Sequence, residues 1–539
     1  MKTKIFFKYI LAAFIAFSMA ACNADFLDEV NPNEATEATS WTTIEEAESA
    51  MATIYSPIRG QMYGYFGAFT GFQNQNVRGD DLHPIQDDPE TWKLTIFTND
   101  PNTGRVTDDW DLLYRSINRA NNFLANIDRV EAPQTEKDTL ISEAHFLRAW
   151  NYFMLVINWG DVPLRLIPAT SDVVMVPSSP ESEVWAQIEK DLEAAKINLP
   201  IERKEKYLGR ATRGAAIAYL GRAYIYQGKY AEGKAELEQL MKDPYKYELI
   251  EDPDQNYTET NEFNKESIFE INYYQYGTGG VWGNDDMNTP QVNILSNFVG
   301  APPGGWYKLQ PSKSIVDEFT KEERPEGADS RWDKRMYTNF FFKYSDYNDV
   351  KPDMRWYGKN SIPMDTLWLK TASKRIGNEP NYSDIDGKPG RFIIKKFTAF
   401  WSDNGDSMYN TEKNTNNIRV MRYAEVLLLH AEACAKTGDI GGANASLKQI
   451  RDRAGLADKT FGSEQELMQE IEHQRLLEFF LEGHRFYDLK RWYTWSQMKE
   501  IFERRGKLGA SNFENKHIYY PIPQGEINTN TAIEQHPLW

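Results

Sequence analysis

Apolar residues recur at helical spacing through the first half and the last quarter of this 539-residue chain. Near the start of this pattern, Thr43 and Glu46 match a capping box, in which each side chain bonds to the backbone near the other residue. The apolar positions that follow are three and four residues apart, as on one face of a helix. They are Ala47, Ala50, Met51, Ile54 and Tyr55. The pattern predicts a first helix here.

Further apolar stripes predict helices around residues 110–120 and 140–159. Ser179 and Pro180 predict another helix start, with the serine as cap and the proline at the first helical position. By contrast, residues 60–107 are rich in glycine, asparagine, aspartate and aromatic residues and show no sustained period. We expect a long loop there, and long ordered loops are often functional.

The strongest repeat signal lies in residues 214–240, which match the tetratricopeptide spacing W-x2-L-G-x2-Y. The matching positions are Ile217, Leu220, Gly221, Tyr224, Gly228 and Tyr230. A degenerate second copy comprises Leu427, Ala431, Cys434, Gly438, Ala443, Leu447 and Ile450, and a looser third comprises His145, Ala149 and Tyr152. Small residues at such positions let two helices approach closely. The chain is therefore predicted to be mainly α-helical, a stacked helical-repeat scaffold interrupted by a large insertion.

The insertion, residues 251–415, is rich in glycine, proline, asparagine, aspartate, tryptophan and tyrosine. Only residues 268–271 and 392–397 resemble short strands. Its aromatic content predicts burial rather than disorder. We expect an irregular, loop-rich subdomain that packs on the helical layer.

The N-terminus has the features of an export signal. In residues 1–21, three lysines precede a short apolar stretch. Small residues then lead into Cys22, as in lipoprotein signals, which are cut immediately before a cysteine that receives the lipid. Residues 22–40 are polar and suit a tether. An ordinary secretory signal cut near Ala21 is the alternative, and no later run reaches the roughly 18 apolar residues of a membrane-spanning helix.

Composition narrows the choice of partners. The chain has 61 Lys+Arg and 79 Asp+Glu, a formal net charge of −18, which disfavours nucleic acids and anionic lipid surfaces. With only two cysteines, a lipidated Cys22 would leave Cys434 without a disulfide partner, so stability would come from core burial. The chain is unusually aromatic, with 15 Trp, 29 Tyr and 28 Phe, and we expect some of these rings to face solvent.

Residues 470–492 collect histidines, acids and arginines, but their spacing argues against a metal or acid/base site. The two histidines are eleven residues apart, whereas a zinc-type pair needs histidines four residues apart on one helical face. Glu478 and Glu482 share a face and are expected to form structural ion pairs. The arginines near enough in sequence to neutralise them are Arg475, Arg485 and Arg491.

No residue is a candidate for nucleophilic catalysis, because the sequence lacks a G-x-S-x-G elbow and Cys434 is expected to lie inside a buried helix. We expect no cofactor and no bound metal. Paired carboxylates for glycoside cleavage remain open, since 79 acids allow many pairs and only geometry would choose one.

Clusters of aromatic residues beside polar side chains are the positive signal for binding. Sugar rings present an apolar C–H face, so loop tryptophans and tyrosines can stack against them while polar neighbours bond the hydroxyls. For any single aromatic residue, filling the core is the commoner role. The candidate ligand-binding residues are Tyr65, Arg78, Asp81 and Trp92 in the first loop and Tyr276, Trp282, Trp306 and Tyr307 in the insertion.

Several motifs together resemble the SusD/RagB family, lipoproteins that pair with SusC-type TonB-dependent transporters. The resemblance covers essentially the whole chain, and its C-terminal motifs are the most specific. The motifs are Asp25-Phe26-Leu27-Asp28 after Cys22, WDLLYRSINRAN at 110–121, RYAEVLLLHAEA at 422–433, IRDRAGL at 450–456, residues 475–492, and the tail from Tyr520-Pro521-Ile522-Pro523 through Asn528 to Pro537.

The resemblance implies four tetratricopeptide-like helix pairs carrying a variable, loop-rich face. In the glycan-binding members a shallow aromatic arc on that face binds the ligand, and the transporter docks below it. The resemblance also implies a protein held by lipid at the outer membrane, facing outward, with no catalytic step. Trp92 and Trp306 fall in regions where family members often place stacking aromatic residues.

The chain thus divides into a signal peptide (1–21), a lipidated tether (22–40), an N-terminal helical region (41–250), an irregular ligand-face subdomain (251–415) and a C-terminal region that completes the repeats (416–539). We expect it to bind an oligo- or polysaccharide and hand it to a SusC-like TonB-dependent transporter. Peptide capture, as in the RagB branch, is the alternative. A helical glycoside hydrolase and a plain protein–protein scaffold are further alternatives.

Overall fold

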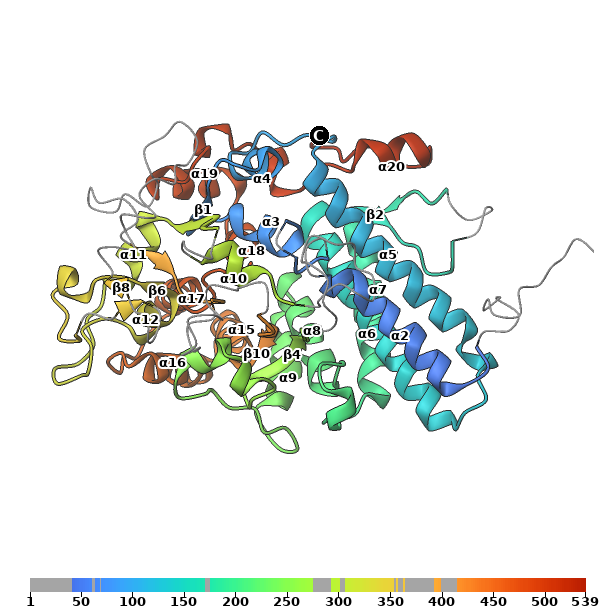
Figure 1. Cartoon of the computed structure of the whole chain (residues 1–539), viewed down its shortest axis with the longest axis horizontal. Helices are drawn as coiled ribbons and strands as arrows, with labels where there is room; N and C mark the ends of the chain where they lie inside the picture. The colour runs from blue at the N-terminus through green and yellow to red at the C-terminus, as the bar shows by residue number, and fades with distance from the viewer. Residues whose placement is uncertain are drawn as a thin grey trace, which may run out of the picture.

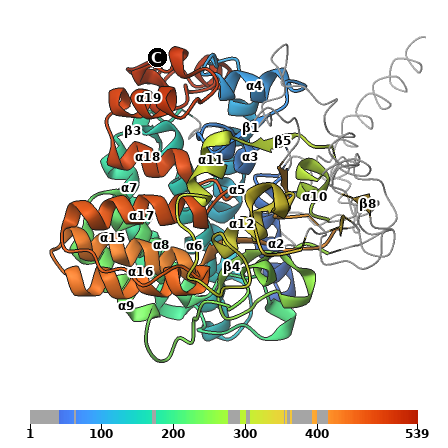
Figure 2. The same ribbon diagram turned by 90° about the vertical axis from the view of Figure 1, so that its left-hand side faces the viewer.

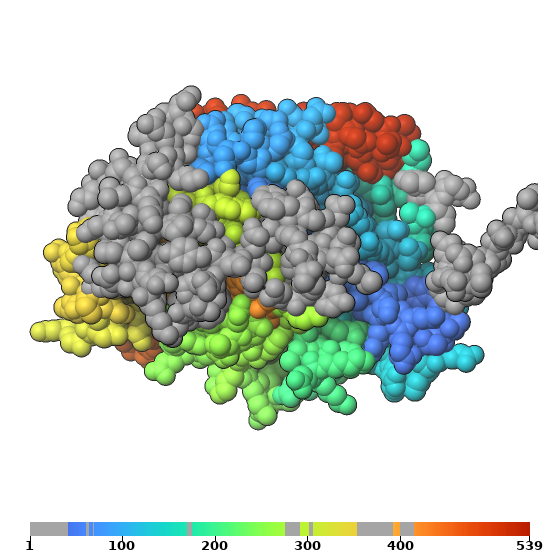
Figure 3. All heavy atoms as spheres, in the orientation of Figure 1, coloured from blue at the N-terminus to red at the C-terminus, as the bar shows by residue number. Residues whose placement is uncertain are grey.

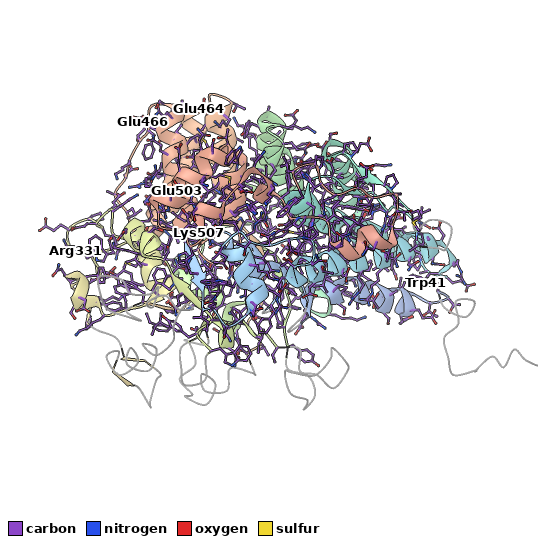
Figure 4. All side chains as sticks on the ribbon, turned by 90° about the horizontal axis from the view of Figure 1, so that it is seen from above. Trp41, Arg331, Glu464, Glu466, Glu503 and Lys507 are labelled. Atoms are coloured by element: carbon purple, nitrogen blue, oxygen red, sulfur yellow. The ribbon has the colours of Figure 1, made fainter. Side chains whose placement is uncertain are left out.

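The computed structural model describes residues 41–60, 64–67, 69–169, 175–274, 292–300, 306–352, 355–356, 362–363, 392–398 and 414–539. The predicted signal peptide, the predicted lipidation site Cys22 and the predicted tether lie outside these residues, as do Tyr276 and Trp282. Trp41, the first described residue, and Arg331 lie toward opposite ends of the long axis (Figure 4).

Paired helices form the N-terminal region. They are α2 (Ile44–Arg59), α5 (Gly104–Asn126), α6 (Gln134–Trp159), α7 (Glu181–Asn198), α8 (Arg213–Tyr226) and α9 (Tyr230–Leu240). Helix α2 packs on α5, α6 on α7 and α8 on α9, and α2, α5, α6 and α7 run side by side in Figure 1. The capping box at Thr43 and Glu46 is present, as predicted. Helix α7 starts one residue later than expected, with Pro180 rather than Ser179 as its cap residue.

The C-terminal region adds a second set of helices. They are α15 (Tyr423–Lys436), α16 (Ile440–Ala454), α17 (Glu464–Glu478), α18 (Arg485–Trp492), α19 (Trp495–Arg504) and α20 (Gln524–Thr529). Helices α15, α16 and α17 stack as a layer in Figure 2, and α15 also packs on α8 and α9. The fold is therefore mainly α-helical, as predicted. The pairs α2–α5, α6–α7, α8–α9 and α15–α16 are consistent with the expected four tetratricopeptide-like pairs.

Two glycines set the close approach of α8 and α9. A Cβ atom added at Gly221 would lie 2.8 Å from Cγ of Leu237, and one added at Gly233 would lie 3.0 Å from the carbonyl oxygen of Gly221. Both distances are shorter than ordinary van der Waals contact. This confirms the prediction that small residues permit the helix crossing.

Short strands and helices make up the described part of the insertion. Strand β4 (Ser267–Ile271) pairs antiparallel with β10 (Ile418–Arg422), and β6 (Phe340–Phe341) pairs with β9 (Ile393–Ile394). The other elements are β5 (Leu309–Pro311), β7 (Arg355–Trp356), β8 (Ile362–Pro363), α10 (Leu295–Val299), α11 (Lys313–Phe319), α12 (Lys334–Asn339), η4 (Pro253–Tyr257), η5 (Glu259–Asn261) and η6 (Tyr344–Tyr347). The predicted strand at 268–271 is confirmed, and that at 392–397 is shorter than expected.

The prediction of a long irregular loop at 60–107 is wrong. The segment contains α3 (Gly71–Val77), β1 (Leu82–Pro84) and α4 (Pro89–Thr95). These elements are too short to show a period, and the partner of β1 is β5, more than 200 residues away, so no local pattern announces it. Elsewhere the chain forms β2 (Val162–Pro163), β3 (Ser178–Ser179), η2 (Ile127–Arg129), η3 (Glu205–Tyr207), η9 (Ala510–Asn512) and η10 (Asn515–Ile518).

The core is rich in large aromatic side chains. Trp110, Trp150 and Trp159 are fully buried, and the rings of Trp110 and Trp159 meet edge to face with centroids 5.4 Å apart. Cys434 lies buried within α15, as expected. Among the described residues, no helix combines the length and the apolarity needed to cross a membrane.

Candidate functional site

The pairing of the buried strands β1 and β5 brings together two segments that are far apart in the sequence. Lys308, just before β5, accepts a hydrogen bond from the backbone of Ile85 at 2.8 Å, and its ammonium group contacts the carboxylate of Asp87. Trp306, two residues earlier, donates its backbone N–H to the carbonyl of Asn297 at 2.6 Å. The segment that follows Trp306 therefore lies beside the loop that leads into α4, the helix that carries Trp92.

Phe69 and Arg105 extend this surface. The Arg105 guanidinium lies 5.2 Å from the ring centroid of Phe69, which meets the buried ring of Phe298 edge to face at 5.6 Å. Phe69, Trp92 and Trp306 are all partly exposed. We call Phe69, Trp92, Arg105 and Trp306 the aromatic patch. Aromatic rings with one packed side and one exposed side can offer a flat apolar face to a ligand.

Asp88 holds the patch in place. Its carboxylate caps α4 by accepting from the Glu90 backbone at 3.1 Å and accepts from Nη2 of Arg105 at 2.7 Å. Burial raises the pKa of Asp88, but the Arg105 guanidinium outweighs that effect and brings the pKa below its ordinary value. The carboxylate is thus ionised at neutral pH, and Arg105 is fixed over Phe69 by a charged hydrogen bond.

The charges around the patch are balanced or acidic. Each nearby cation in the described segments contacts a carboxylate: Lys93 pairs with Glu90, Arg105 with Asp88 and Asp108, and Lys308 with Asp87. An anionic ligand would therefore have to displace an existing ion pair. The described part of the patch suits a neutral ligand with many hydroxyl groups.

Two of the predicted ligand residues, Tyr65 and Tyr307, belong to the core, so the prediction that they contact ligand does not agree with the structure. The Tyr65 side chain is 1% exposed, its hydroxyl accepts from Nε2 of Gln75 at 2.7 Å, and its ring meets Trp150 edge to face. Tyr307 is completely buried, and its hydroxyl donates to the carbonyl of Phe392 at 3.3 Å. Both rings fill space between elements distant in sequence.

Arg78 also needs correction, because its side chain is 2% exposed. One guanidinium nitrogen donates to the carbonyl of His517 at 2.7 Å, and the group lies over the rings of Phe486 and Tyr520, 3.8 and 4.2 Å from their centroids. Arg78 joins the end of α3 to the C-terminal region. Its role is structural, and the sequence around it carries no sign of these partners.

Asp81 is buried as well, beside the fully buried Asp80. Burial, together with the neighbouring carboxylate of Asp80, raises the pKa of Asp81 to about 6. Asp80 accepts two hydrogen bonds from Arg485, at 2.7 and 3.1 Å, and pairs with Nε of Arg505 at 2.5 Å. Asp80 thus ties the start of β1 to α18 and to Arg505, which follows α19. Asp81 is not available to a ligand.

Trp92 and Trp306 have the partial exposure that a stacking role requires, and that role stays a prediction. Sequence reasoning did not select Phe69 or Arg105 as site residues. Phe69 lies in the same aromatic-rich segment as Trp92, and this composition is the one feature of the sequence that could have identified Phe69 as a site residue. Nothing in the sequence around Arg105 marks it as a site residue, because its contact with Phe69 depends on how α5 packs against α3 and α4.

The expected ion pairs in residues 470–492 are present, but with different partners. Glu478 is paired with Arg335, Arg422 and Arg453, and Glu482 with Lys396 and Arg422. The arginines predicted to neutralise them pair elsewhere: Arg475 with Asp488, Arg485 with Asp80 and Glu472, and Arg491 with Glu432 and Asp488. Burial raises the pKa of Glu478, but three guanidinium groups lower it well below its ordinary value.

Asp109, on α5 close to Arg105, gives a pH-dependent prediction. It is buried, accepts from Nδ2 of Asn74 at 2.8 Å, and has its pKa raised to about 8 by burial. Between about pH 4 and pH 8 the folded state then holds a proton that the unfolded state has lost. Stability from this group falls as pH rises through that window, by at most about 1.4 kcal/mol per pH unit.

Asp109→Asn removes the titrating proton and keeps an oxygen that can accept from Asn74. We expect the variant to gain stability relative to the native chain as pH rises from about 4 to 8, measured by urea unfolding at several pH values. Asp128→Asn, at an exposed position, is the control and should show no such trend. A stability difference for Asp109→Asn that does not change with pH would contradict the assignment.

The fold and this surface define a class of protein: a large, mainly helical scaffold with partly exposed aromatic residues and a loop-rich insertion. Comparison with known families agrees. A family model described as "SusD family" matches residues 265–539, and one described as "Starch-binding associating with outer membrane" matches residues 25–225. The chain belongs to the SusD family.

Individual relatives are similar over most of their length. SusD-like protein P2 of Formosa agariphila is 24% identical over 457 residues, which cover 82% of each chain. Starch-binding protein SusD of Bacteroides thetaiotaomicron is 24% identical over 504 residues, 88% of this chain and 87% of that protein. A SusD superfamily protein from Bacteroides vulgatus superposes with a TM-score of 0.75 at 26% identity, covering 93% of this chain and 100% of that one. A laminarin-binding SusD-like protein superposes with a TM-score of 0.71 at 25% identity, covering 93% and 100%.

Proposed function

We propose that this protein binds a glycan through the aromatic patch and delivers it to a SusC-like TonB-dependent transporter, without catalysis. The observation that carries the proposal is the placement of Phe69, Trp92 and Trp306 as partly exposed rings beside fixed polar groups. The similar proteins described as laminarin-binding and starch-binding support a carbohydrate as the ligand class.

Binding follows from the chemistry of the patch. The exposed side of a ring can stack on the apolar C–H face of a pyranose, while carboxylates such as Asp87 and Asp108 accept hydrogen bonds from sugar hydroxyls. By analogy with bases stacked on aromatic residues, each ring contributes about 1 to 3 kcal/mol. A few such contacts give modest affinity, which suits a protein that must release its ligand to a transporter.

The location follows from the N-terminus and from the family. The lipid attached to Cys22 would hold the chain at the outer membrane, and the polar tether would let the patch face the exterior. The family description that mentions association with the outer membrane supports this placement. Mass spectrometry of the mature N-terminus is expected to find palmitate or a related acyl group on Cys22, and an unmodified cysteine would overturn the anchor.

Trp306→Ala is expected to weaken glycan binding about tenfold or more, because it removes one stacking face. Calorimetric titration with laminarin and with starch oligosaccharides would measure the loss. Trp495→Ala, which removes an exposed tryptophan on α19, is the matched control and should bind like the native chain. Equal binding by Trp306→Ala and the native chain would exclude the patch.

The same purified protein can be used to test peptide capture and glycoside hydrolysis, the alternative functions. Binding of a peptide panel without binding of any glycan would favour peptide capture. Release of reducing ends from a bound polysaccharide would show that the protein is a glycoside hydrolase.

A further inference from the structure

Two adjoining pockets lie in the N-terminal half of the molecule, away from the aromatic patch. One pocket, of about 440 Å³, lies between residues 201–212, 244–247 and 263–270. A second, of about 330 Å³, lies between α2, residues 206–210 and residues 270–272. The two share Leu208, Gly209, Arg210 and Glu270 in their walls. They lie on the two sides of this shared wall, and we call them together the tyrosine groove; each has the volume of a small-molecule site.

The wall that the two pockets share, which we call the ridge, is held closely. Nδ2 of Asn272 donates to the carbonyl of Leu208 at 2.9 Å. Gly209 has a φ of +87°, and a Cβ atom there would lie 2.7 Å from the amide of Asn272. Glycine is therefore required at this position, and the ridge has a defined shape.

A buried carboxylate fixes two arginines in the walls. Glu143 is fully buried and accepts from Arg203 at 2.9 Å, from Arg210 at 2.8 Å and from the hydroxyl of Tyr55 at 2.7 Å. Arg203 and Arg210 line the first pocket, and Tyr55 lines the second. Because Glu143 holds them, the arginines lose little conformational freedom when a ligand binds.

Tyrosine rings give the groove its flat apolar surfaces. Tyr245 and Tyr247 stack with centroids 6.0 Å apart and an angle of 8°, and Tyr247 continues to Tyr423 at 6.3 Å and 24°. On the other side of the ridge, the Tyr207 ring lies 4.9 Å from the ammonium of Lys206 and 5.1 Å from the guanidinium of Arg210. Tyr207, Tyr245 and Tyr247 are all partly exposed.

The groove is basic although the chain is acidic. Its walls contain Arg59, Arg203, Lys206, Arg210, Lys246 and Lys265, against Glu48, Glu202 and Glu270. Arg203 and Arg210 are paired with Glu143, Lys206 with Glu48 and Lys265 with Glu248. The two lysine pairs are exposed, and exposed pairs are weak enough for a ligand to replace. Glu270 is paired with Arg419 behind the groove. Lys246 is exposed and has no ion pair within the part of the chain that the structure describes. In a chain with a formal net charge of −18, this surface is a local attractor for anions.

We propose that the tyrosine groove is a second saccharide site, selective for oligosaccharides that carry carboxylate groups. The Tyr245 ring stacks on a sugar ring, and the exposed lysines of the rim pair with the carboxylates, while Arg203 and Arg210, held by Glu143, add positive charge beneath them. The aromatic patch differs from the groove because each of its described cations is paired with a carboxylate, whereas Lys246 of the groove has no ion pair in the described part of the chain. The two sites differ in charge and in place: in Figure 3 the green segment of the groove forms the lower edge, while the blue and yellow-green segments of the patch lie above it.

Calorimetric titration of the full chain with short oligogalacturonides tests the proposal. Lys246→Gln combined with Lys265→Gln removes two exposed cations from the rim without touching the core. We expect the dissociation constant to rise about tenfold, equivalent to about 1.4 kcal/mol. Binding to the native chain should also weaken with added salt. Tyr245→Ala should reduce binding to a similar extent by removing a stacking face.

Matched controls separate this site from the aromatic patch. Lys313→Gln removes a lysine whose side chain is 54% exposed on α11 and should leave oligogalacturonide binding unchanged. Trp306→Ala should also leave it unchanged, whatever its effect on neutral glycans. The inference is overturned if oligogalacturonides do not bind, if the groove variants bind them like the native chain, or if Trp306→Ala abolishes their binding. Binding of oligoglutamate but not of oligogalacturonide would overturn the saccharide assignment in favour of an acidic peptide.

Discussion

Replacing Glu478 by alanine is expected to lower the free energy of unfolding by about 3 to 5 kcal/mol. The carboxylate lies between Arg335 from the insertion and Arg422 and Arg453 from the C-terminal helices, and all of these groups are buried. Removing it leaves three guanidinium charges without their shared partner in a region that excludes water. The loss should appear as a lower midpoint in urea unfolding, with circular dichroism as the probe.

Glu464→Ala is the matched control on the same helix. Glu464 is 54% exposed, pairs with Lys436 at 2.7 Å and lies at the outer end of α17 (Figure 4). Exposed pairs contribute about 1 kcal/mol or less, because water and salt screen them. Equal losses of stability in the two variants would show that the buried ion pairs of Glu478 contribute no more than an exposed pair.

Asp80→Ala is expected to have an effect of similar size, about 3 to 5 kcal/mol, because it removes the fully buried carboxylate that Arg485 and Arg505 share beneath β1 and leaves them only Glu472 and Glu318 as partners. Burial raises the pKa of Asp80, but the two guanidinium groups outweigh it and hold the pKa well below its ordinary value. The stabilisation is therefore present above the unfolded-state pKa, near 4, and is lost as pH falls toward the folded-state pKa. Unfolding measured at pH 7 and at pH 3 should show a smaller difference between variant and native chain at the lower pH.

Asp317→Ala serves as the control for this second prediction. Asp317 pairs with Lys313 at 2.5 Å, and both side chains are 54% exposed, so its loss should change stability little at either pH. A second readout follows from Asp81, whose pKa is raised in part by the charge of Asp80. Asp80→Ala should lower the pKa of Asp81, and carboxyl titration by NMR that finds no change would contradict the coupling.

The long helices could be predicted from sequence because their signal is local. The stripe from Ala47 to Tyr55, the close approach at Gly221 of α8, and the burial of Cys434 all follow from periodicity within one or two helices, whereas Gly233 of α9 was not selected. The short elements α3, β1 and α4 could not be predicted, because each has seven residues or fewer and β1 depends on a partner strand elsewhere in the chain.

The candidate site shows the same limit. Tyr65 and Trp306 look alike in sequence, each an aromatic residue in a glycine-rich segment, yet one is buried against Trp150 and the other reaches the surface. Burial is decided by packing between elements that are distant in sequence. Composition could therefore identify the aromatic-rich segments but not which of their aromatic residues are exposed. Likewise, the sequence predicted that Glu478 would form ion pairs. It could not predict the partners, because they lie up to 143 residues away.

The β4–β10 pair joins the two ends of the insertion, so the insertion can change in length during evolution at little cost in stability. Ile271 pairs with Ile418, and just outside the strands Nδ2 of Asn417 donates to Oδ1 of Asn272 at 2.8 Å. The chain therefore leaves the scaffold and returns to it at one point, and lengthening such an excursion costs little, about 0.6 kcal/mol per doubling. Arg335 and Lys396, however, lie inside it and neutralise Glu478 and Glu482 of the scaffold. Grafting this region between homologues to alter ligand preference should succeed only where the donor sequence brings cations to those two positions.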